Sequence, residues 1–394
     1  MSWAGPHQDA IGKSAHPRPD VTVTYNPHRS TLLCLSHLRW SFVYQRPQHL
    51  MARFARHYNV LFFEEPIPDA GDDPYLEVRP DEDGVQVLVP HLQAGISSEA
   101  TYQALRRLLD DYLTDLGVTE PLLWYYTPMS LSFSAHLPRR ITLYDCMDEL
   151  SAFRGAPPAL VERERELLAQ ADVVFTGGVS IWEAKRQLHH NAHAFPSSVD
   201  IAHFAIARQH LADPPDQAAI PHPRLGFYGV IDERFDIDLL SEAATLRPEW
   251  QFVMIGPVVK IDPASLPRQS NIHYLGGKTY DELPRYLGGW DVALMPFALN
   301  ESTRFISPTK TPEYLAGGCP VVSTAITDVV RTYGESGVVR IADTAQRFVD
   351  ACADMMDKAA DRERFLAEAD RTLGDMSWDQ TYARMHEVIE KCLR

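Results

Sequence analysis

The chain has 394 residues, 45% of them hydrophobic and 23% charged, which is typical of a globular protein with two or three domains. Its net charge of −16, from 37 basic and 53 acidic residues, argues against broad nucleic-acid binding. The sequence has no apolar run of about eighteen residues and no basic segment followed by an apolar one, so we expect neither a membrane span nor a secretory signal.

The first half of the chain is predicted to be a flexible tail, residues 1–30, followed by an α/β domain, residues 31–200. A strand, a helix with Pro47 in its first turn and a second strand follow one another closely, which predicts a parallel βαβ unit. The last predicted strand is expected to close the sheet. The predicted strands are residues 31–36, 60–64, 85–90, 122–126, 141–144 and 172–176.

The second half is predicted to be another α/β domain, residues 201–377, followed by an amphipathic helix, residues 378–394, that packs back on the first domain. Helix-length segments separate most of its apolar runs, which favours parallel strands. The architecture predicted is therefore two doubly wound domains in tandem. The predicted strands of the second domain are residues 225–230, 251–256, 272–276, 292–295, 320–322 and 338–341.

The segment 307–322 contains the strongest candidate binding site, because a short helix opened by prolines follows a buried strand there. Lys310 and Glu313 lie on one side of this helix, and Ser307 and Thr309 lie in the loop before it. Open α/β sheets bind phosphates at such a place. A lysine on the phosphates and a glutamate on the ribose hydroxyls would hold a nucleoside diphosphate. The alternative is an exposed ion pair on an ordinary helix.

A second candidate site follows the predicted strand 141–144, where Asp145 and Asp148 emerge at the carboxyl edge of the first sheet. Either carboxylate would suit a general base that orients or deprotonates an acceptor hydroxyl. His37 follows the first strand and is expected at the same edge. The alternative for the two aspartates is a helix cap or a solvated acidic loop.

These motifs occur in an order that resembles the GT-B glycosyltransferases of the group 1, family four-like, type found in bacterial polysaccharide biosynthesis. Residues 197–204 look like the segment that joins the two domains in that family, and residues 225–230 look like its first donor-domain strand. The resemblance implies two Rossmann-like domains that face a cleft. The first would bind the acceptor and the second the nucleotide sugar.

The resemblance also implies roles for four further residues. Arg234 takes the place of a diphosphate ligand, although the lysine that usually accompanies it is absent; the alternative is a surface pair with Glu233 or Asp236. Gly276 and Gly277 correspond to a loop that packs on the nucleotide base. The family often has a glutamate eight positions before the one that corresponds to Glu313, but this chain has Phe305 there, so Glu301 is the nearest candidate.

The function implied is transfer of a sugar from a nucleoside-diphosphate sugar, UDP-linked, to an acceptor hydroxyl in the synthesis of a bacterial surface polysaccharide or glycolipid. Lys310 and Arg234 would take the place of a metal, so we expect a metal-independent hexosyltransferase-like enzyme without a cofactor. A non-catalytic nucleotide-sugar-binding protein and a sugar-nucleotide epimerase are the alternatives.

The partners implied are the nucleotide-sugar donor and a carbohydrate or lipid-linked acceptor, with no nucleic acid. Five scattered cysteines without a C-x-x-C pair indicate reduced thiols and a cytoplasmic protein. Peripheral contact with the inner face of the membrane is left open.

Overall fold

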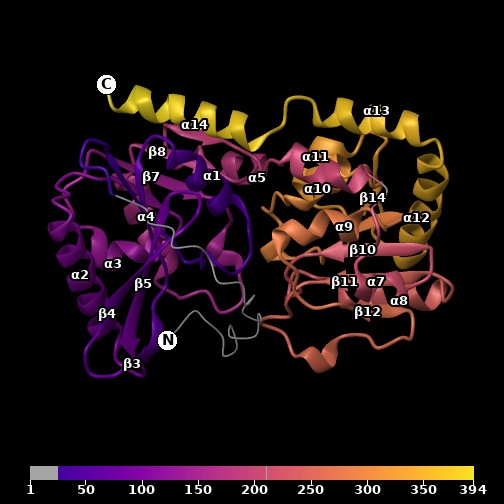
Figure 1. The fold of residues 1–394 in the computed structure, drawn as a ribbon, viewed down its shortest axis with the longest axis horizontal. Coiled ribbons are helices and arrows are strands. Elements are labelled where there is room, and N and C mark those ends of the chain that lie inside the picture. The colour runs from indigo at the N-terminus through magenta and orange to yellow at the C-terminus, as the bar shows by residue number, and fades with distance from the viewer. Residues whose placement is uncertain (1–24, 210) are drawn as a thin grey trace. The chain divides into compact units, whose positions relative to one another are not determined.

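The computed structural model of the protein describes residues 25–394 except residue 210. The predicted tail, residues 1–30, lies outside the described residues as far as residue 24. The described residues form two compact units, each with one sheet flanked by helices (Figure 1). The first unit contains residues 25–196 and 381–394, and the second contains residues 197–380.

The first unit has a sheet in the order β3-β5-β2-β1-β6-β7-β8-β9, with β4 paired antiparallel to β5 and the other neighbours parallel. The order reverses between β1 and β6, which makes that position the switch point of a doubly wound sheet. The strands are β1 (Thr31–Leu35), β2 (Asn59–Phe63), β3 (Ile67–Ala70), β4 (Tyr75–Pro80), β5 (Val85–Gln93), β6 (Leu122–Tyr125), β7 (Ile141–Cys146), β8 (Val173–Thr176) and β9 (Ala192–Ala194).

The central strands of this sheet are fully buried, as expected for strands covered by helices on both faces. Trp124 of β6 is the largest fully buried side chain of this unit and packs against Phe54 and Phe175. The helices are α1 (Arg46–Phe54), α2 (Ser98–Asp115), η1 (Pro128–Ser130), α3 (Leu131–Ser134), η2 (Leu150–Ala152), α4 (Leu160–Gln170) and α5 (Val179–Lys185).

The second unit has a parallel sheet in the order β12-β11-β10-β13-β14-β15, whose switch point lies between β10 and β13. Its central strands are buried, and Leu225, Phe252 and Val292 are completely so. The strands are β10 (Arg224–Tyr228), β11 (Gln251–Ile255), β12 (Ile272–Tyr274), β13 (Val292–Met295), β14 (Val321–Ser323) and β15 (Val339–Ile341).

The helices of the second unit pack in groups: α8 contacts α12, whereas α10 contacts α6 and α13. They are α6 (Ile201–Phe204), η3 (Ala205–Arg208), α7 (Pro215–Ala218), α8 (Ile237–Leu246), η4 (Pro263–Ser265), η5 (Tyr280–Glu282), α9 (Leu283–Leu287), η6 (Glu301–Thr303), α10 (Lys310–Ala316), α11 (Thr327–Tyr333), α12 (Ala345–Ala359) and α13 (Arg362–Leu373).

The last helix, α14 (Trp378–Cys392), begins in the second unit and belongs to the first unit from Thr381 onward. Its Tyr382 ring lies 4.9 Å from the ring of Phe54, and the Tyr58 hydroxyl lies 3.1 Å from His386 Nε2. The helix therefore covers α1. None of the described helices is both long and apolar enough to cross a bilayer.

The predicted α/β class and the two doubly wound sheets are confirmed. One detail of the prediction is wrong, because the strand at 172–176 does not close the first sheet. It is β8, and β9 pairs with it on the outer side. The strand β9 is short and its residues are only half-buried, so it gives no apolar run that the sequence would reveal.

Candidate active site

The Lys310 side chain lies over the end of β10. Gly229 follows this strand with φ of 138°, and a Cβ at this residue would lie 2.2 Å from Lys310 Cε. The Lys310 ammonium lies 5.7 Å from the ring centroid of Phe227 and 5.9 Å from that of Phe297, which is within range of cation–π attraction. Because β10 and β13 flank the switch point, this ammonium lies where open α/β sheets bind ligands.

Glu313 lies one turn after Lys310 and is 5% exposed. Its Oε2 accepts a hydrogen bond of 2.8 Å from the Tyr228 hydroxyl. Burial raises the pKa of the Glu313 carboxyl to about 7, although Lys310 and the hydroxyls of Tyr228 and Thr309 act in the opposite direction. The carboxyl is therefore close to half protonated at neutral pH. A ligand that donates hydrogen bonds to it would favour the ionised form.

Two tyrosines that the sequence analysis missed join β10 to α10. The backbone N–H of Tyr228 donates to the Tyr314 hydroxyl over 3.1 Å, and the Tyr228 hydroxyl donates to Glu313. Both rings are buried, and they meet edge to face at 4.8 Å. This double connection fixes Glu313 relative to the strand end. The available signal was a tyrosine at the end of an otherwise apolar strand, since a buried hydroxyl usually needs a partner.

Glycine backbone lines the carboxyl ends of the next two strands. A Cβ on Gly256, after β11, would lie 1.8 Å from the Gly229 carbonyl oxygen, so the two chains can approach only without a side chain there. The Gly256 N–H donates to the Gly276 carbonyl over 2.9 Å. Open space surrounds the Cβ positions of Gly276 and Gly277, the two glycines predicted to face the base. Their contact with a base stays a prediction.

Arg234 lies in the loop after β10, as predicted for a phosphate ligand, but it pairs within that loop. Its Nε lies 2.9 Å and its terminal nitrogen 2.7 Å from the two carboxylate oxygens of Asp232, which is 3% exposed. The structure thus pairs Arg234 with Asp232, a residue that the sequence analysis did not name. The buried carboxylate offsets the charge of the arginine, so Arg234 is a weaker anion ligand than a lone guanidinium.

The remaining donor-side candidates lie in the loop between β13 and α10. Glu301 begins η6, its side chain is 81% exposed, and its carboxylate is 3.9 Å from the Arg304 guanidinium. The Glu301 side chain therefore lies in solvent, whereas Glu313 is buried. Ser307 is half-buried, and Thr309 is the residue before α10 whose hydroxyl interacts with Glu313.

In the first unit, Asp145 lies at the end of β7 and is held by Arg46 of α1. The guanidinium donates to both carboxylate oxygens over 2.9–3.2 Å, and a further nitrogen donates to the Phe195 carbonyl over 2.7 Å. Arg46 is 2% and Asp145 0% exposed. This burial and pairing argue against the predicted role of Asp145 as a general base and indicate a structural ion pair instead.

A second buried cluster of charged side chains holds the rest of the acidic loop in place. Lys185, 3% exposed, lies 2.7 Å from carboxylates of both Glu149 and Glu164. On the other side, Gly177 lets the backbone of Met147 approach so closely that a Cβ on the glycine would lie 2.3 Å from its carbonyl oxygen. The loop is therefore anchored on both sides of Asp148.

Asp148 and His37, the other two predicted first-unit residues, are both half-buried. Burial alone would lower the pKa of Arg46, but Asp145 and, more weakly, Asp148 raise it above its ordinary value, so Asp148 also lies in the field of this guanidinium. His37 follows β1, and β6 lies between β1 and β7. The three residues thus share one edge of the sheet, and Asp145 and Asp148 share one loop.

Comparison with solved structures shows which fold the two sheets build. The chain is similar to sucrose-phosphate synthase of Thermosynechococcus elongatus, with a TM-score of 0.69 and 15% identity over 92% of this chain and 99% of that one. It is also similar to HepE of Anabaena, solved in complex with UDP, with a TM-score of 0.63 and 12% identity over 92% and 100%. The fold is GT-B, as predicted.

Comparison of sequences adds a match to a family over part of the chain. Residues 222–358 match the family of glycosyl transferases group 1. These residues are called the group 1 segment below. The Bacillus subtilis protein TuaH, with the provisional name teichuronic acid biosynthesis glycosyltransferase, is 27% identical over 221 residues. The match covers 51% of this chain and 55% of TuaH, so the chain spans about half the length of that relative.

The group 1 segment contains every donor-side residue described above, from Arg234 to Glu313. Asp145, Asp148 and His37 lie outside it, in the first unit.

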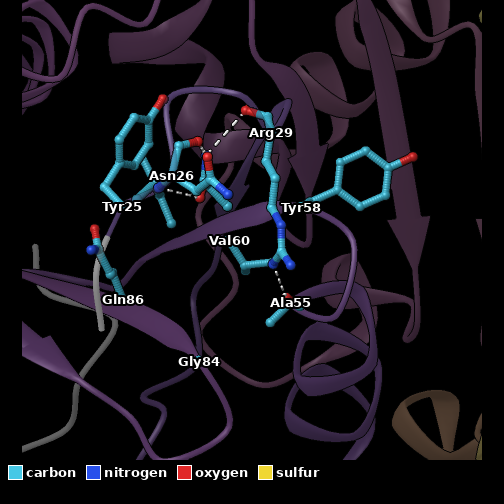
Figure 2. A pocket seen from close by; sticks show the side chains of 10 residues that line it. Tyr25, Asn26, Arg29, Ala55, Tyr58, Val60, Gly84 and Gln86 are labelled. Carbon is cyan, nitrogen blue, oxygen red and sulfur yellow. Dashed lines mark hydrogen bonds between the residues drawn. The ribbon is translucent and has the colours of Figure 1, made fainter. Parts of the chain in front are cut away.

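A cavity of about 260 Å³ lies in the first unit, outside the group 1 segment. Figure 2 shows its lining, in which the Arg29 guanidinium reaches the Ala55 carbonyl over 3.4 Å. Val60 near the start of β2 and Gln86 near the start of β5 also line it. The cavity is therefore at the amino edge of the sheet, opposite the edge that carries His37 and Asp145.

Proposed function

We propose that the protein is a glycosyltransferase that moves a sugar from a nucleoside-diphosphate sugar to an acceptor hydroxyl in the synthesis of a bacterial surface polysaccharide or glycolipid. The observation that carries this proposal is the placement of Lys310 and Glu313 at the switch point of a group 1 segment. The activity implied by the names of the similar proteins points the same way.

On the donor side, Lys310 binds the diphosphate and Glu313 accepts hydrogen bonds from the ribose. The ammonium stabilises the charge that grows on the leaving phosphate, and such interactions lower the barrier most when they strengthen in the transition state. The helix α10 has only seven residues, so we assign the phosphate to the lysine side chain instead of the helix terminus. Arg234, already paired with Asp232, supports it at longer range.

We propose UDP as the nucleotide, since HepE was solved with UDP and a similar trehalose-phosphate synthase of Burkholderia vietnamiensis is described as UDP-forming. The reaction needs no metal in this proposal, because Lys310 supplies the cation. We place it in the cytoplasm, with a carbohydrate or lipid-linked acceptor and contact only with the inner face of the membrane.

On the acceptor side, the acceptor oxygen forms a bond to the anomeric carbon while the bond from that carbon to the phosphate oxygen breaks. The electron pair of the broken bond leaves with the nucleoside diphosphate. We assign the hydroxyl proton to the carboxylate of Asp148, since Asp145 is engaged by Arg46. His37, at the same sheet edge, is the second candidate.

Thermal melting against a panel of UDP-, GDP-, CMP- and dTDP-sugars tests whether the protein binds a sugar nucleotide and which base it prefers. A ligand that binds only the folded protein raises its stability, by about 2.7 kcal/mol at a hundredfold excess over the dissociation constant. We therefore expect UDP-sugars to raise the melting temperature most. Stabilisation without transfer to any acceptor would support a non-catalytic binding protein, and no stabilisation by any member would contradict the proposal.

A further inference from the structure

The turn between β10 and α8 carries a buried carboxylate that the proposed mechanism does not use. Both carboxylate oxygens of Glu233 are buried, and neither has a hydrogen-bond partner among the residues that the structure describes. Removing a charge from water without a partner is costly, and buried polar groups are almost always paired in folded proteins. A buried carboxylate without a partner in the chain indicates that a bound ligand donates hydrogen bonds to it.

The turn itself is firmly held, so the position of Glu233 is fixed by its neighbours. Asp232 accepts hydrogen bonds from the Arg234 backbone over 3.0 Å and from its guanidinium. Asp236 caps α8 by accepting from the Leu239 N–H over 2.9 Å. These bonds use the carboxylates on either side and leave the structure of the turn independent of the Glu233 side chain.

The turn also lies beside Lys310, because the two share an aromatic support. Phe235 packs edge to face on Phe227 at 5.0 Å and forms a β-bridge with Phe297. Phe227 and Phe297 are the two rings that flank the Lys310 ammonium. The Glu233 carbonyl further accepts a hydrogen bond of 3.3 Å from Asn300, in the loop that leads to α10.

The charge of Glu233 decides which part of a nucleotide sugar it suits. A carboxylate repels a diphosphate, whereas the hydroxyl groups of a sugar can donate to its two oxygens. We propose that Glu233 accepts hydrogen bonds from hydroxyls of the transferred sugar and is thus a specificity-determining residue of the donor site. This inference rests on the proposed glycosyltransferase function and names the contact by which the enzyme would select its sugar.

The test compares each sugar nucleotide that binds with the free nucleotide of the same base, by calorimetry on the full chain. Glu233→Gln is expected to weaken the sugar nucleotide roughly 10- to 100-fold, which is the usual effect of losing a charged hydrogen bond, and to leave the free nucleotide unchanged. Glu249→Gln is the matched control, because this side chain is 57% exposed and precedes β11 at the opposite sheet edge. Urea unfolding of Glu233→Gln is expected to be no easier than that of the natural chain, since a buried charge is removed.

Four results would overturn the inference. Equal weakening of the sugar nucleotide and the free nucleotide would place Glu233 on the nucleotide, and unchanged binding of both would remove it from the site. A loss of affinity that appears only with Mg²⁺ present and disappears in EDTA would assign Glu233 to a cation. If the natural chain itself binds none of these nucleotides, the proposed function fails, and the assignment of Glu233 fails with it.

Discussion

Replacement of Asp148 by asparagine is expected to reduce turnover roughly 10²- to 10⁴-fold, the usual contribution of a general base. The neighbouring carboxylates of Asp145 and Glu149 are anchored by Arg46 and Lys185, so the loop that presents Asp148 should keep its shape. The dissociation constant of the nucleotide is expected to stay the same, because the donor-side residues are in the second unit. Release of UDP from the donor, with an acceptor that the natural chain uses, measures the effect.

The matched control for Asp148→Asn is Glu166→Gln on α4, whose side chain is 41% exposed. A rise in the acceptor KM with little change in kcat would give Asp148 an orienting role instead of a proton-transfer role. Near-normal transfer by Asp148→Asn would remove it from the mechanism and direct the same test to His37.

Removal of the Arg46 guanidinium is expected to lower the free energy of unfolding far more than removal of a surface charge does. Arg46→Met leaves the Asp145 carboxylate buried without its cation, and breaking such a pair costs about 3–5 kcal/mol in the free energy of unfolding. It also removes the hydrogen bond to the Phe195 carbonyl, one residue before the chain leaves the first unit at residue 196. Pulse proteolysis in urea, read at cleavage sites in the first unit, measures the change.

Two further variants separate the buried pair from a general effect of lost charge. Arg163→Met on α4 breaks a pair whose side chains are 37% and 41% exposed, and such surface pairs contribute only about 0–1 kcal/mol. The double variant Arg46→Met, Asp145→Leu is expected to recover much of the lost stability, since apolar replacements of buried pairs are often tolerated. A loss in Arg46→Met no greater than in Arg163→Met would contradict the structural role given to this pair.

The sequence predicted the interior strands and α10 because their signals are local. Buried parallel strands such as β1 and β13 are continuous apolar runs. The end of α10 is likewise marked by the glycine that caps it, Gly317. The exposed hairpin strand β4 and the short β9 lack such runs, so they were missed.

The contacts that define the site were harder to predict, because they join residues far apart in the chain. Asp145 was recognised as part of a motif, but its partner Arg46 lies 99 positions away and nothing local indicates that they pair. Tyr228 and Glu313 are separated by 85 positions. The sequence also does not show which of two glutamates is buried. Glu301 is in solvent, whereas Glu313 is in the core.

The claim that Glu313 binds the nucleotide ribose is tested most directly by calorimetric titration of UDP at about pH 6 and about pH 8. With a pKa of about 7, Glu313 is mostly protonated at the lower pH, so affinity is expected to rise roughly tenfold as the pH increases through 7. Glu313→Gln is expected to bind UDP roughly 10- to 100-fold more weakly at pH 8. It should keep only the pH dependence of the nucleotide phosphates themselves. Equal affinity and an identical pH profile in the two proteins would contradict the assignment.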